Sequence, residues 1–123
     1  MVWRTLGRFR YNRRMRRATS FRIVLVTCGS LSEARKIARA VVEKKLAACV
    51  NIHTAPVESF YWWKGKVETG REYLLVMKTA ARLVKLLEEE VLRLHSYETP
   101  EFLVMEIAAG ADGYVEWLGK SVK

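Results

Sequence analysis

The sequence predicts an α+β sandwich with the element order β-α-β-β-α-β, in which two helices cover one face of an antiparallel sheet. Three observations predict it: a β-branched apolar run at residues 21–27, apolar residues at helical spacing in residues 32–45 and again in 81–94, and hairpin signals at residues 57–79. With 123 residues, the chain has the length of one domain.

The first half of the domain is expected to form strand, helix and strand. The run Phe21–Thr27 is apolar and β-branched, as in a strand buried on both faces. Ser30 precedes Glu33 by three residues, which is a capping-box pattern, and apolar side chains then recur on one helical face. We therefore expect a helix over residues 32–45 and a second strand over residues 46–53.

The second half is expected to form a hairpin, a helix, a strand and a terminal helix. Lys64 and Gly65 supply the hairpin turn, and the polar residues 69–71 are expected to connect two strands. The predicted elements are strands at 57–63, 66–68 and 73–79, a helix at 81–94, a strand at 102–107, and a helix at 114–121 with Asp112 as its N-cap. Together these elements make a ferredoxin-like fold with an extended β-hairpin and a C-terminal helix.

The positive charge of the chain is concentrated at its N-terminus. The formal net charge is +9, and residues 1–20 contribute seven arginines without any acid, which leaves +2 for residues 21–123. We expect residues 1–20 to be a disordered basic arm, with two alternatives open: translation begins at Met15, or the segment is a transit peptide. Nucleic-acid binding is expected only through this arm. No apolar run is long enough for a membrane helix, so we expect no membrane span.

The two cysteines show neither CxxC spacing nor the paired pattern of a disulfide scaffold, which favours a reducing, cytoplasmic setting. Cys49 stands in an apolar run and is expected to be buried, whereas Cys28 ends a strand and is expected to be the more exposed of the two.

The segment Phe60-Tyr61-Trp62-Trp63 gives both faces of a hairpin strand aromatic side chains. A small sheet buries only one face easily, so this pattern predicts self-association. The alternative is that the terminal helix covers the second face within the same chain.

Three segments carry a resemblance to a known family: Lys45–Ile52 (KLAACVNI), Ser59–Glu68 (SFYWWKGKVE) and His95–Glu101 (HSYETPE). Together they resemble the CutA divalent-ion tolerance proteins, over residues 21–122. The resemblance implies a ferredoxin-like homotrimer that binds divalent cations, copper above all, and that has no catalytic activity. Two departures from the family pattern are Ser96, where proline is usual, and the connection at residues 54–58.

A metal site is expected around His95, because imidazole is a suitable ligand for copper and zinc. One histidine does not make a site, so Cys28, Glu98 or Glu101 would have to join it, with the metal held weakly or exchangeably. Family members pair this histidine with a cysteine that aligns with Val26 here. The alternative for His95 is a helix C-terminal residue that interacts with the helix dipole. The residues expected at an interface or intersubunit pocket are Phe60, Tyr61, Trp62, Trp63, Lys66, Glu68 and Tyr97.

Two other classes of function compete with metal tolerance. A trimeric small-molecule or nucleotide sensor of the nitrogen-regulatory signalling type would use the same fold, although the scattered glycines form no phosphate cradle. An enzyme is not expected, since the sequence has no nucleophile elbow, P-loop or metalloprotease motif.

Overall fold

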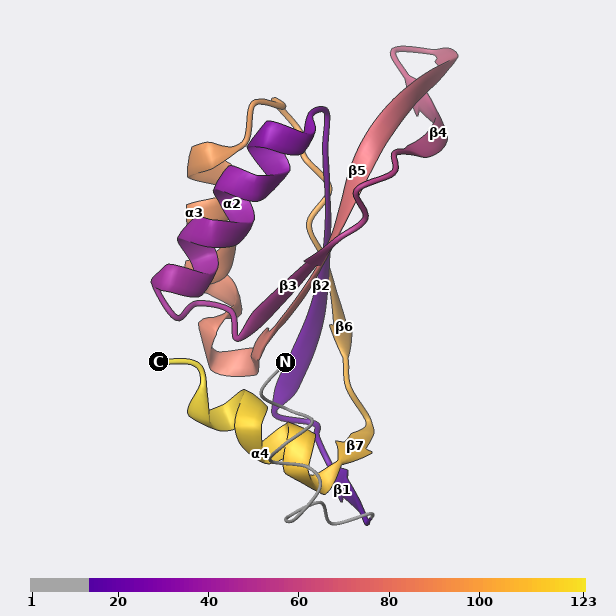
Figure 1. Cartoon of the computed structure of the whole chain (residues 1–123). Helices are drawn as coiled ribbons and strands as arrows, with labels where there is room; N and C mark the ends of the chain where they lie inside the picture. Colours follow the sequence, from indigo (N-terminus) through magenta and orange to yellow (C-terminus); the bar gives the residue numbers. More distant parts are fainter. Residues whose placement is uncertain (1–13) are drawn as a thin grey trace.

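The computed structural model describes residues 14–123, which form a β-sheet with two helices on one face and a long hairpin projecting from one end (Figure 1). The residues of the basic arm up to position 13 lie outside the described part. The strands are β1 (Met15–Arg17), β2 (Phe21–Cys28), β3 (Cys49–Ile52), β4 (Val57–Trp63), β5 (Lys66–Ala80), β6 (Leu103–Glu106) and β7 (Ala109–Ala111). The helices are α2 (Leu31–Glu43), η1 (Ala81–Leu83), α3 (Val84–Leu94) and α4 (Asp112–Lys120).

The main sheet has the ferredoxin-like strand order β3-β5-β2-β6, and all its pairs are antiparallel. This order confirms the predicted fold class. The structure differs from the prediction in β5, which is one strand of 15 residues and not two strands with a polar connection. Residues 69–71 continue the ladder because they pair with residues 58–60 of β4. The first half of β5 therefore builds the hairpin, and the second half enters the main sheet.

The core lies between the sheet and helices α2 and α3. Alternate side chains of β2 point into it, so Val24, Val26 and Cys28 are fully buried, whereas Ile23 and Leu25 are only partly covered. The prediction that this strand is buried on both faces therefore does not hold for one chain. The other residues of the central cluster come from both helices and from β5; they include Ala34, Ile37, Val41, Leu75, Met77, Leu87 and Val91.

Helix α2 begins as the sequence predicted. Ser30 is its N-cap, and the Ser30 hydroxyl accepts a hydrogen bond from the backbone N–H of Glu33 at 3.2 Å. The expected N-cap of the terminal helix is different, because α4 begins at Asp112 itself and no side chain caps it. Asp112 instead accepts a hydrogen bond from Arg16 at 2.6 Å.

That contact belongs to a small second sheet that the sequence did not predict. Strand β1 pairs antiparallel with β7, and Ala18 behind it is buried. Residues 15–17, which belong to the predicted basic arm, therefore form a strand in the structure. Strand β1 is held by backbone hydrogen bonds to β7 and by the Arg16–Asp112 ion pair. Neither contact requires apolar residues at regular spacing, so the sequence gives no sign of this strand.

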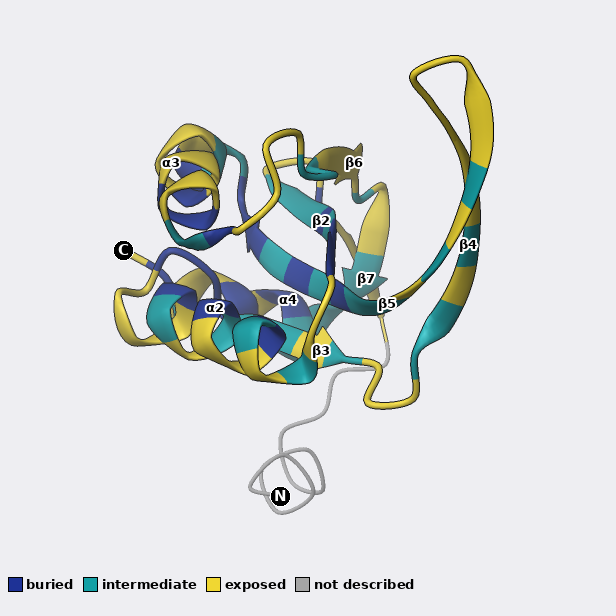
Figure 2. Ribbon diagram, turned by 90° about the horizontal axis from the view of Figure 1, so that it is seen from above, coloured by how far each residue is buried: buried dark blue, intermediate teal, exposed yellow. Residues whose placement is uncertain are grey.

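The aromatic hairpin projects away from the rest of the chain (Figure 2). Phe60 is 66% exposed, Trp62 74%, and Tyr61 and Trp63 45% each. Helix α4 does not cover them. It packs at the opposite end of the sheet, where Leu118 meets a cluster that includes Ala48, Ala80 and Leu83. The alternative in which the terminal helix hides the second aromatic face is therefore wrong.

Candidate functional site

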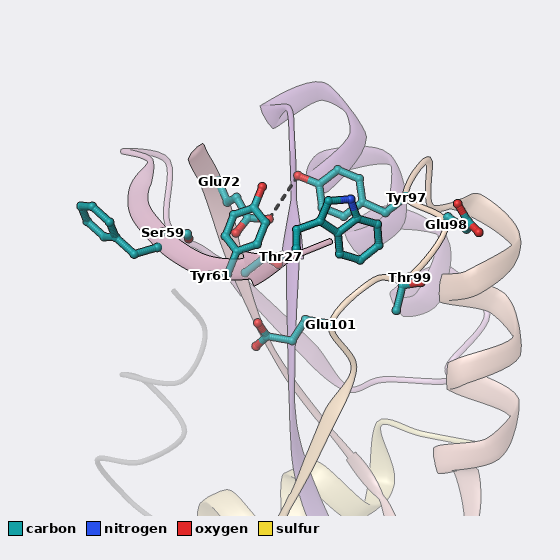
Figure 3. Close-up of a pocket in the computed structure, with 10 residues that line it drawn as sticks. Thr27, Ser59, Tyr61, Glu72, Tyr97, Glu98, Thr99 and Glu101 are labelled. Atoms are coloured by element: carbon teal, nitrogen blue, oxygen red, sulfur yellow. Dashed lines mark hydrogen bonds between the residues drawn. The ribbon is translucent and has the colours of Figure 1, made fainter. Parts of the chain in front are cut away.

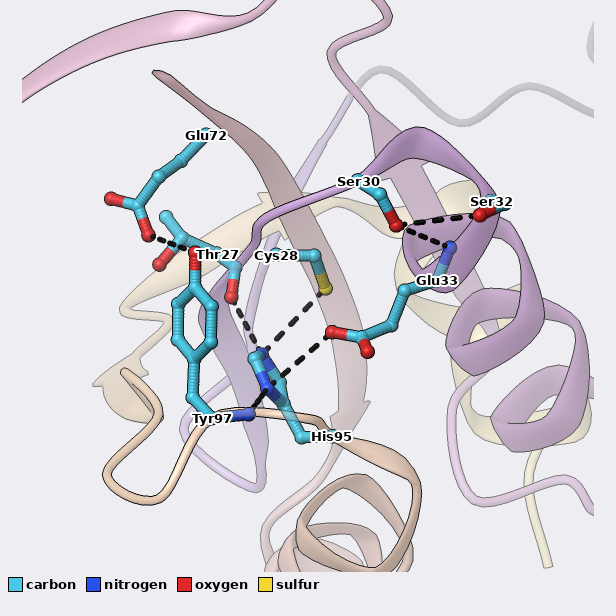
Figure 4. Close-up of polar contacts among 8 residues, drawn as sticks. All are labelled: Thr27, Cys28, Ser30, Ser32, Glu33, Glu72, His95 and Tyr97. Carbon is cyan, nitrogen blue, oxygen red and sulfur yellow. Dashed lines mark hydrogen bonds and ion pairs between the residues drawn. The ribbon is translucent and has the colours of Figure 1, made fainter. Parts of the chain in front are cut away.

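Three side chains with metal-binding atoms meet where β2, α2 and α3 come together (Figure 4). Cys28 is the last residue of β2, Glu33 lies in the first turn of α2, and His95 is the C-cap of α3. One potential ligand atom from each of the three lies within 4.8 Å of the other two. Among residues 14–123, this is the one such group of three or more histidine, cysteine and acidic side chains.

The ring of His95 is buried and both of its nitrogens are engaged. Its Nδ1 accepts a hydrogen bond from the backbone N–H of Tyr97 at 3.1 Å, so Nε2 carries the proton and donates it to the carbonyl oxygen of Thr27 at 2.7 Å. The sulfur of Cys28 lies 3.7 Å from Nε2. Backbone groups on both sides therefore fix the orientation of this imidazole, a common property of metal-ligating histidines.

Glu33 supplies a carboxylate oxygen that lacks a hydrogen-bond partner among the described residues. Its Oε2 lies 3.5 Å from Nδ1 of His95, is buried, and has no hydrogen-bond partner in the described part of the chain. The lone pair of Nδ1 already accepts the Tyr97 N–H, so this nitrogen has no proton to offer the carboxylate. A buried carboxylate oxygen without a partner is costly, and a cation would relieve that cost.

Cys28 is fully buried, which corrects the prediction that it is the more exposed cysteine; Cys49 is the half-buried one. Strand β2 continues into the core up to its last residue, so its end is not at the surface. Burial, with smaller contributions from Glu33 and Glu72, raises the pKa of the Cys28 thiol to about 12. The thiol is therefore protonated at neutral pH, and a metal ion would have to displace its proton.

The donor set suits a borderline or soft divalent ion. A cysteine thiolate, an imidazole nitrogen and a carboxylate oxygen are ligands that zinc and copper accept, and three protein ligands leave a fourth coordination position open. The buried Oε2 of Glu33 receives no hydrogen bond from the other described residues, and a bound cation would provide the missing partner. The three residues present therefore fit a divalent metal.

The predicted ligands divide between two places. His95 and Cys28 come together, but Glu98 and Glu101 line a separate pocket, and Glu33 takes the acidic position beside His95. Sequence reasoning missed Glu33 because the capping-box pattern gave it a different role. The available signal was the short distance in sequence between Cys28 at the end of a strand and Glu33 in the first turn of the next helix, which keeps the two residues close in space.

The pocket lies between the base of the hairpin and the segment that follows α3 (Figure 3), and its volume is about 560 Å³. Tyr97 connects it to the cluster, because its hydroxyl donates to Oε2 of Glu72 at 3.1 Å while its ring lies 4.8 Å from that of His95. Burial and then Glu72 raise the pKa of Tyr97 to about 12. The lining residues are Thr27, Ser59, Phe60, Tyr61, Trp63, Glu72, Tyr97, Glu98, Thr99 and Glu101.

The remaining predicted interface residues lie further out on the hairpin. Trp62 and Lys66 are exposed and Glu68 is partly exposed, and none of the three lines the pocket. Tyr61 and Trp63 share one hairpin face and both line the pocket. Phe60, on the same strand face as Trp62, also lines the pocket, whereas Trp62 itself stays open in the single chain.

Similarity to known proteins agrees with the fold and with the resemblance in the sequence. Residues 22–121 match the family model described as CutA1 divalent ion tolerance protein. The chain is 39% identical over 100 residues to a divalent-cation tolerance protein CutA of Archaeoglobus fulgidus, covering 81% of this chain and 96% of that protein. It is 42% identical to a chloroplastic CutA protein of Arabidopsis thaliana, over 82% of this chain but only 55% of that protein.

A solved structure agrees in the same way. The structure described as the periplasmic divalent cation tolerance protein CutA from Archaeoglobus fulgidus superposes with a TM-score of 0.80 at 38% identity, covering 84% of this chain and 99% of that one. Similarity at this level over nearly the whole body shows common family membership. The chain belongs to the CutA1 divalent ion tolerance family.

Proposed function

We propose that this protein binds a divalent transition-metal cation, copper first and zinc next, through Cys28, Glu33 and His95. The single observation that carries the proposal is the buried, unpartnered Oε2 of Glu33 within 3.5 Å of a histidine ring and beside a buried thiol. When bound, the metal would supply a positive charge that attracts the carboxylate oxygen, the imidazole nitrogen and the cysteine sulfur. The protein would act in divalent-cation tolerance by binding, without catalysis.

The ligands are presented from three elements whose positions the core fixes. His95 is held by the Tyr97 N–H and the Thr27 carbonyl, Cys28 by the end of β2, and Glu33 by the capped first turn of α2. Exchangeable binding follows from the same geometry, because ligation through His95 requires one of its two backbone hydrogen bonds to break. A metal held here would be weaker than one in a site with free ligand atoms.

We further propose that the protein is a homotrimer. One chain leaves Phe60, Trp62 and Val67 of the hairpin exposed, together with Leu103, Val104 and Met105 on the edge strand β6. Aromatic and aliphatic surface of this extent is typical of a protein interface and not of a monomer surface. A wild-type chain that sediments as a single subunit at micromolar concentration would contradict the homotrimer.

The compartment we propose is a reducing one, the cytoplasm, because metal ligation by Cys28 requires a free thiol. The names of relatives include periplasmic and chloroplastic proteins, so family membership does not fix the compartment. No helix among residues 14–123 is long and apolar enough to cross a membrane.

Calorimetric titration of the full chain with Cu²⁺ and Zn²⁺ tests metal binding. Three variants remove one ligand each: Cys28→Ser, Glu33→Gln and His95→Gln. Each has a matched control that makes the same chemical change elsewhere: Cys49→Ser, Glu98→Gln and His53→Gln. We expect each ligand variant to lose more than about tenfold in affinity, since even changes around a ligand shell cost about 10- to 100-fold. Ligand variants that bind as tightly as their controls would refute the site.

Titration with ATP on the same preparation tests the nucleotide-sensor alternative. The pocket beside the cluster is lined by Glu72, Glu98 and Glu101, and no lysine, arginine or histidine of the described chain, residues 14–123, lines it. Such a surface repels phosphate groups. We therefore expect heat with the metal ions and none with ATP, and the reverse result would favour the sensor.

A further inference from the structure

The pocket at the base of the hairpin has a chemical character that the metal cluster does not explain. It is formed by β4 and β5 on one side and by residues 97–101 on the other, and its volume of about 560 Å³ lies within the range of small-molecule sites (Figure 3). Its walls combine aromatic rings with carboxylates. Ten residues within 14–123 line it, and none of these ten carries a positive charge.

The carboxylates of the pocket are not neutralised. Glu98 and Glu101 make no hydrogen bond or ion pair within residues 14–123, and Glu72 accepts only from the neutral hydroxyl of Tyr97. Other acids of the chain do have cationic partners: Glu90 is paired with Lys44 and Arg93. Burial, and secondly Glu72, raise the pKa of Glu101, as expected where carboxylates share a site without a cation.

The three carboxylates are not placed to chelate one metal ion. In the described part of the chain, only Cys28, Glu33 and His95 bring three such ligand atoms close together. In Figure 3, Glu72, Glu98 and Glu101 lie on separate walls of the pocket. A cation that satisfies them must therefore be larger than a metal ion.

The rest of the lining fits the body of an organic cation. Tyr61, Trp63 and Tyr97 supply aromatic surface, and aromatic faces attract ammonium groups through their quadrupoles. Thr27 lines the same pocket and is only 8% exposed, yet its hydroxyl forms no hydrogen bond with any described residue. This hydroxyl is therefore available to a polar group of a ligand.

We propose that this pocket binds an organic cation, an amine or quaternary ammonium with an apolar body. The carboxylates supply charge complementarity, the aromatic rings cover the apolar body and the cationic head, and the Thr27 hydroxyl meets a polar group. The site is distinct from the metal cluster, although Tyr97 contacts both.

Titration of the full, isotope-labelled chain followed by NMR tests the proposal. Two probes distinguish the forms of the cation: choline, a quaternary ammonium, and spermidine, a linear polyamine. The neutral isostere of choline, 3,3-dimethylbutanol, is the matched ligand control. We expect choline or spermidine to shift the Trp63 indole and Thr27 amide signals saturably, and 3,3-dimethylbutanol to bind on the order of tenfold more weakly because it lacks the charge. Equal binding of choline and its isostere, with no response to spermidine, would overturn the proposal, as would no shift with any probe.

Variants locate the binding and separate it from the metal proposal. Glu101→Gln and Glu98→Gln remove one charge each without breaking a hydrogen bond or ion pair among residues 14–123, and we expect each to weaken the better probe by about fivefold to tenfold. Glu89→Gln on the exposed face of α3 makes the same charge change away from the pocket and should leave the affinity unchanged. Pocket variants that behave like Glu89→Gln would refute the assignment. Cys28→Ser should lose zinc affinity and keep the probe affinity, so that either proposal can fail alone.

Discussion

The backbone N–H of Tyr97 donates a hydrogen bond to Nδ1 of His95 at 3.1 Å, and the two rings lie tilted at 54° with their centroids 4.8 Å apart. The lone pair of Nδ1 is therefore occupied by the Tyr97 N–H, and a metal ion can bind this nitrogen only after that hydrogen bond breaks. Glu33 approaches the same nitrogen, so a cation shared by Glu33 and His95 must displace the Tyr97 N–H. Tyr97 in turn holds Glu72 at the base of the hairpin.

Zinc should therefore perturb the amide signal of Tyr97. In the ¹⁵N-labelled full chain, we expect saturable zinc addition to shift the Tyr97 amide upfield as its hydrogen bond to Nδ1 breaks. The amide of Val115, a buried residue of α4, should not move and serves as the control. Zinc binding with an unmoved Tyr97 amide would show that Nδ1 is not the ligand.

Metal affinity should fall with decreasing pH because of Cys28. Its thiol pKa is raised to about 12, so the thiol is protonated below that pH and must release one proton to bind the metal. This release contributes about a tenfold loss of apparent affinity per unit decrease in pH. Cys28→Ser lacks it, so its pH slope should be lower than that of the wild type by about one proton. Equal slopes in calorimetric titrations between pH 6 and pH 8 would contradict thiolate ligation.

Trp62 should contribute to the trimer. It is the most exposed of the hairpin aromatics and does not line the pocket, so we expect it to be buried by a neighbouring subunit. Trp62→Ser should weaken association by more than about tenfold, as is typical of a central aromatic contact. Leu92→Ser, at an exposed apolar residue of α3, is the control and should leave the sedimentation profile unchanged. The same profile for both variants would place the interface elsewhere.

Gly65 should be required for the hairpin turn. Its φ of +79° lies in the left-handed region, as does the φ of +51° at Lys64, and nothing lies within 4 Å of the position of a Cβ. The cost of Gly65→Ala is therefore conformational and not steric, about 1 kcal/mol, and Gly65→Asn should cost less. The exchange rates of the β4–β5 amide protons measure this cost. The exchange rates of the β2 amides should stay the same in both variants. Faster exchange in Gly65→Asn than in Gly65→Ala would disprove this explanation.

Glu90 should stabilise the fold in a defined acidic range. The carboxylate is buried and accepts hydrogen bonds from Arg93 at 3.0 and 2.8 Å and from Lys44 at 2.8 Å, which lower its pKa from 4.5 to about 2. A lowered pKa in the folded state gives stability that is fully present above pH 4.5 and is lost as the pH falls towards 2. Glu90→Gln should therefore cost about 1 to 2 kcal/mol near pH 7.

Urea unfolding between pH 2 and pH 7 measures this effect. The difference between wild type and Glu90→Gln should shrink below pH 4.5 and be nearly absent at pH 2. Glu89→Gln, one residue away and exposed, should show neither the loss at pH 7 nor the change with pH. A constant difference across the range would mean that Glu90 acts through packing and not through its charge.

The sequence alone determined the features that depend on neighbouring residues. The helical spacing of apolar residues predicted α2 and α3, the Ser30–Glu33 pattern predicted the N-cap, and the alternation at residues 60–63 predicted aromatic side chains on both faces of the hairpin. Each signal arises within one turn of helix or a few strand residues, where side-chain direction follows directly from position in the chain. The motif around His95 also identified the histidine of the cluster.

Only the tertiary structure decided the contacts between distant residues. Glu33 and Cys28 reach His95 across more than 60 positions, and β1 pairs with β7 across a similar or greater separation. Local patterns do not encode such pairings, because they depend on how the sheet and helices pack and not on any one segment. The burial of Cys28, the unpartnered oxygen of Glu33 and the acidic aromatic pocket are properties of that packing alone.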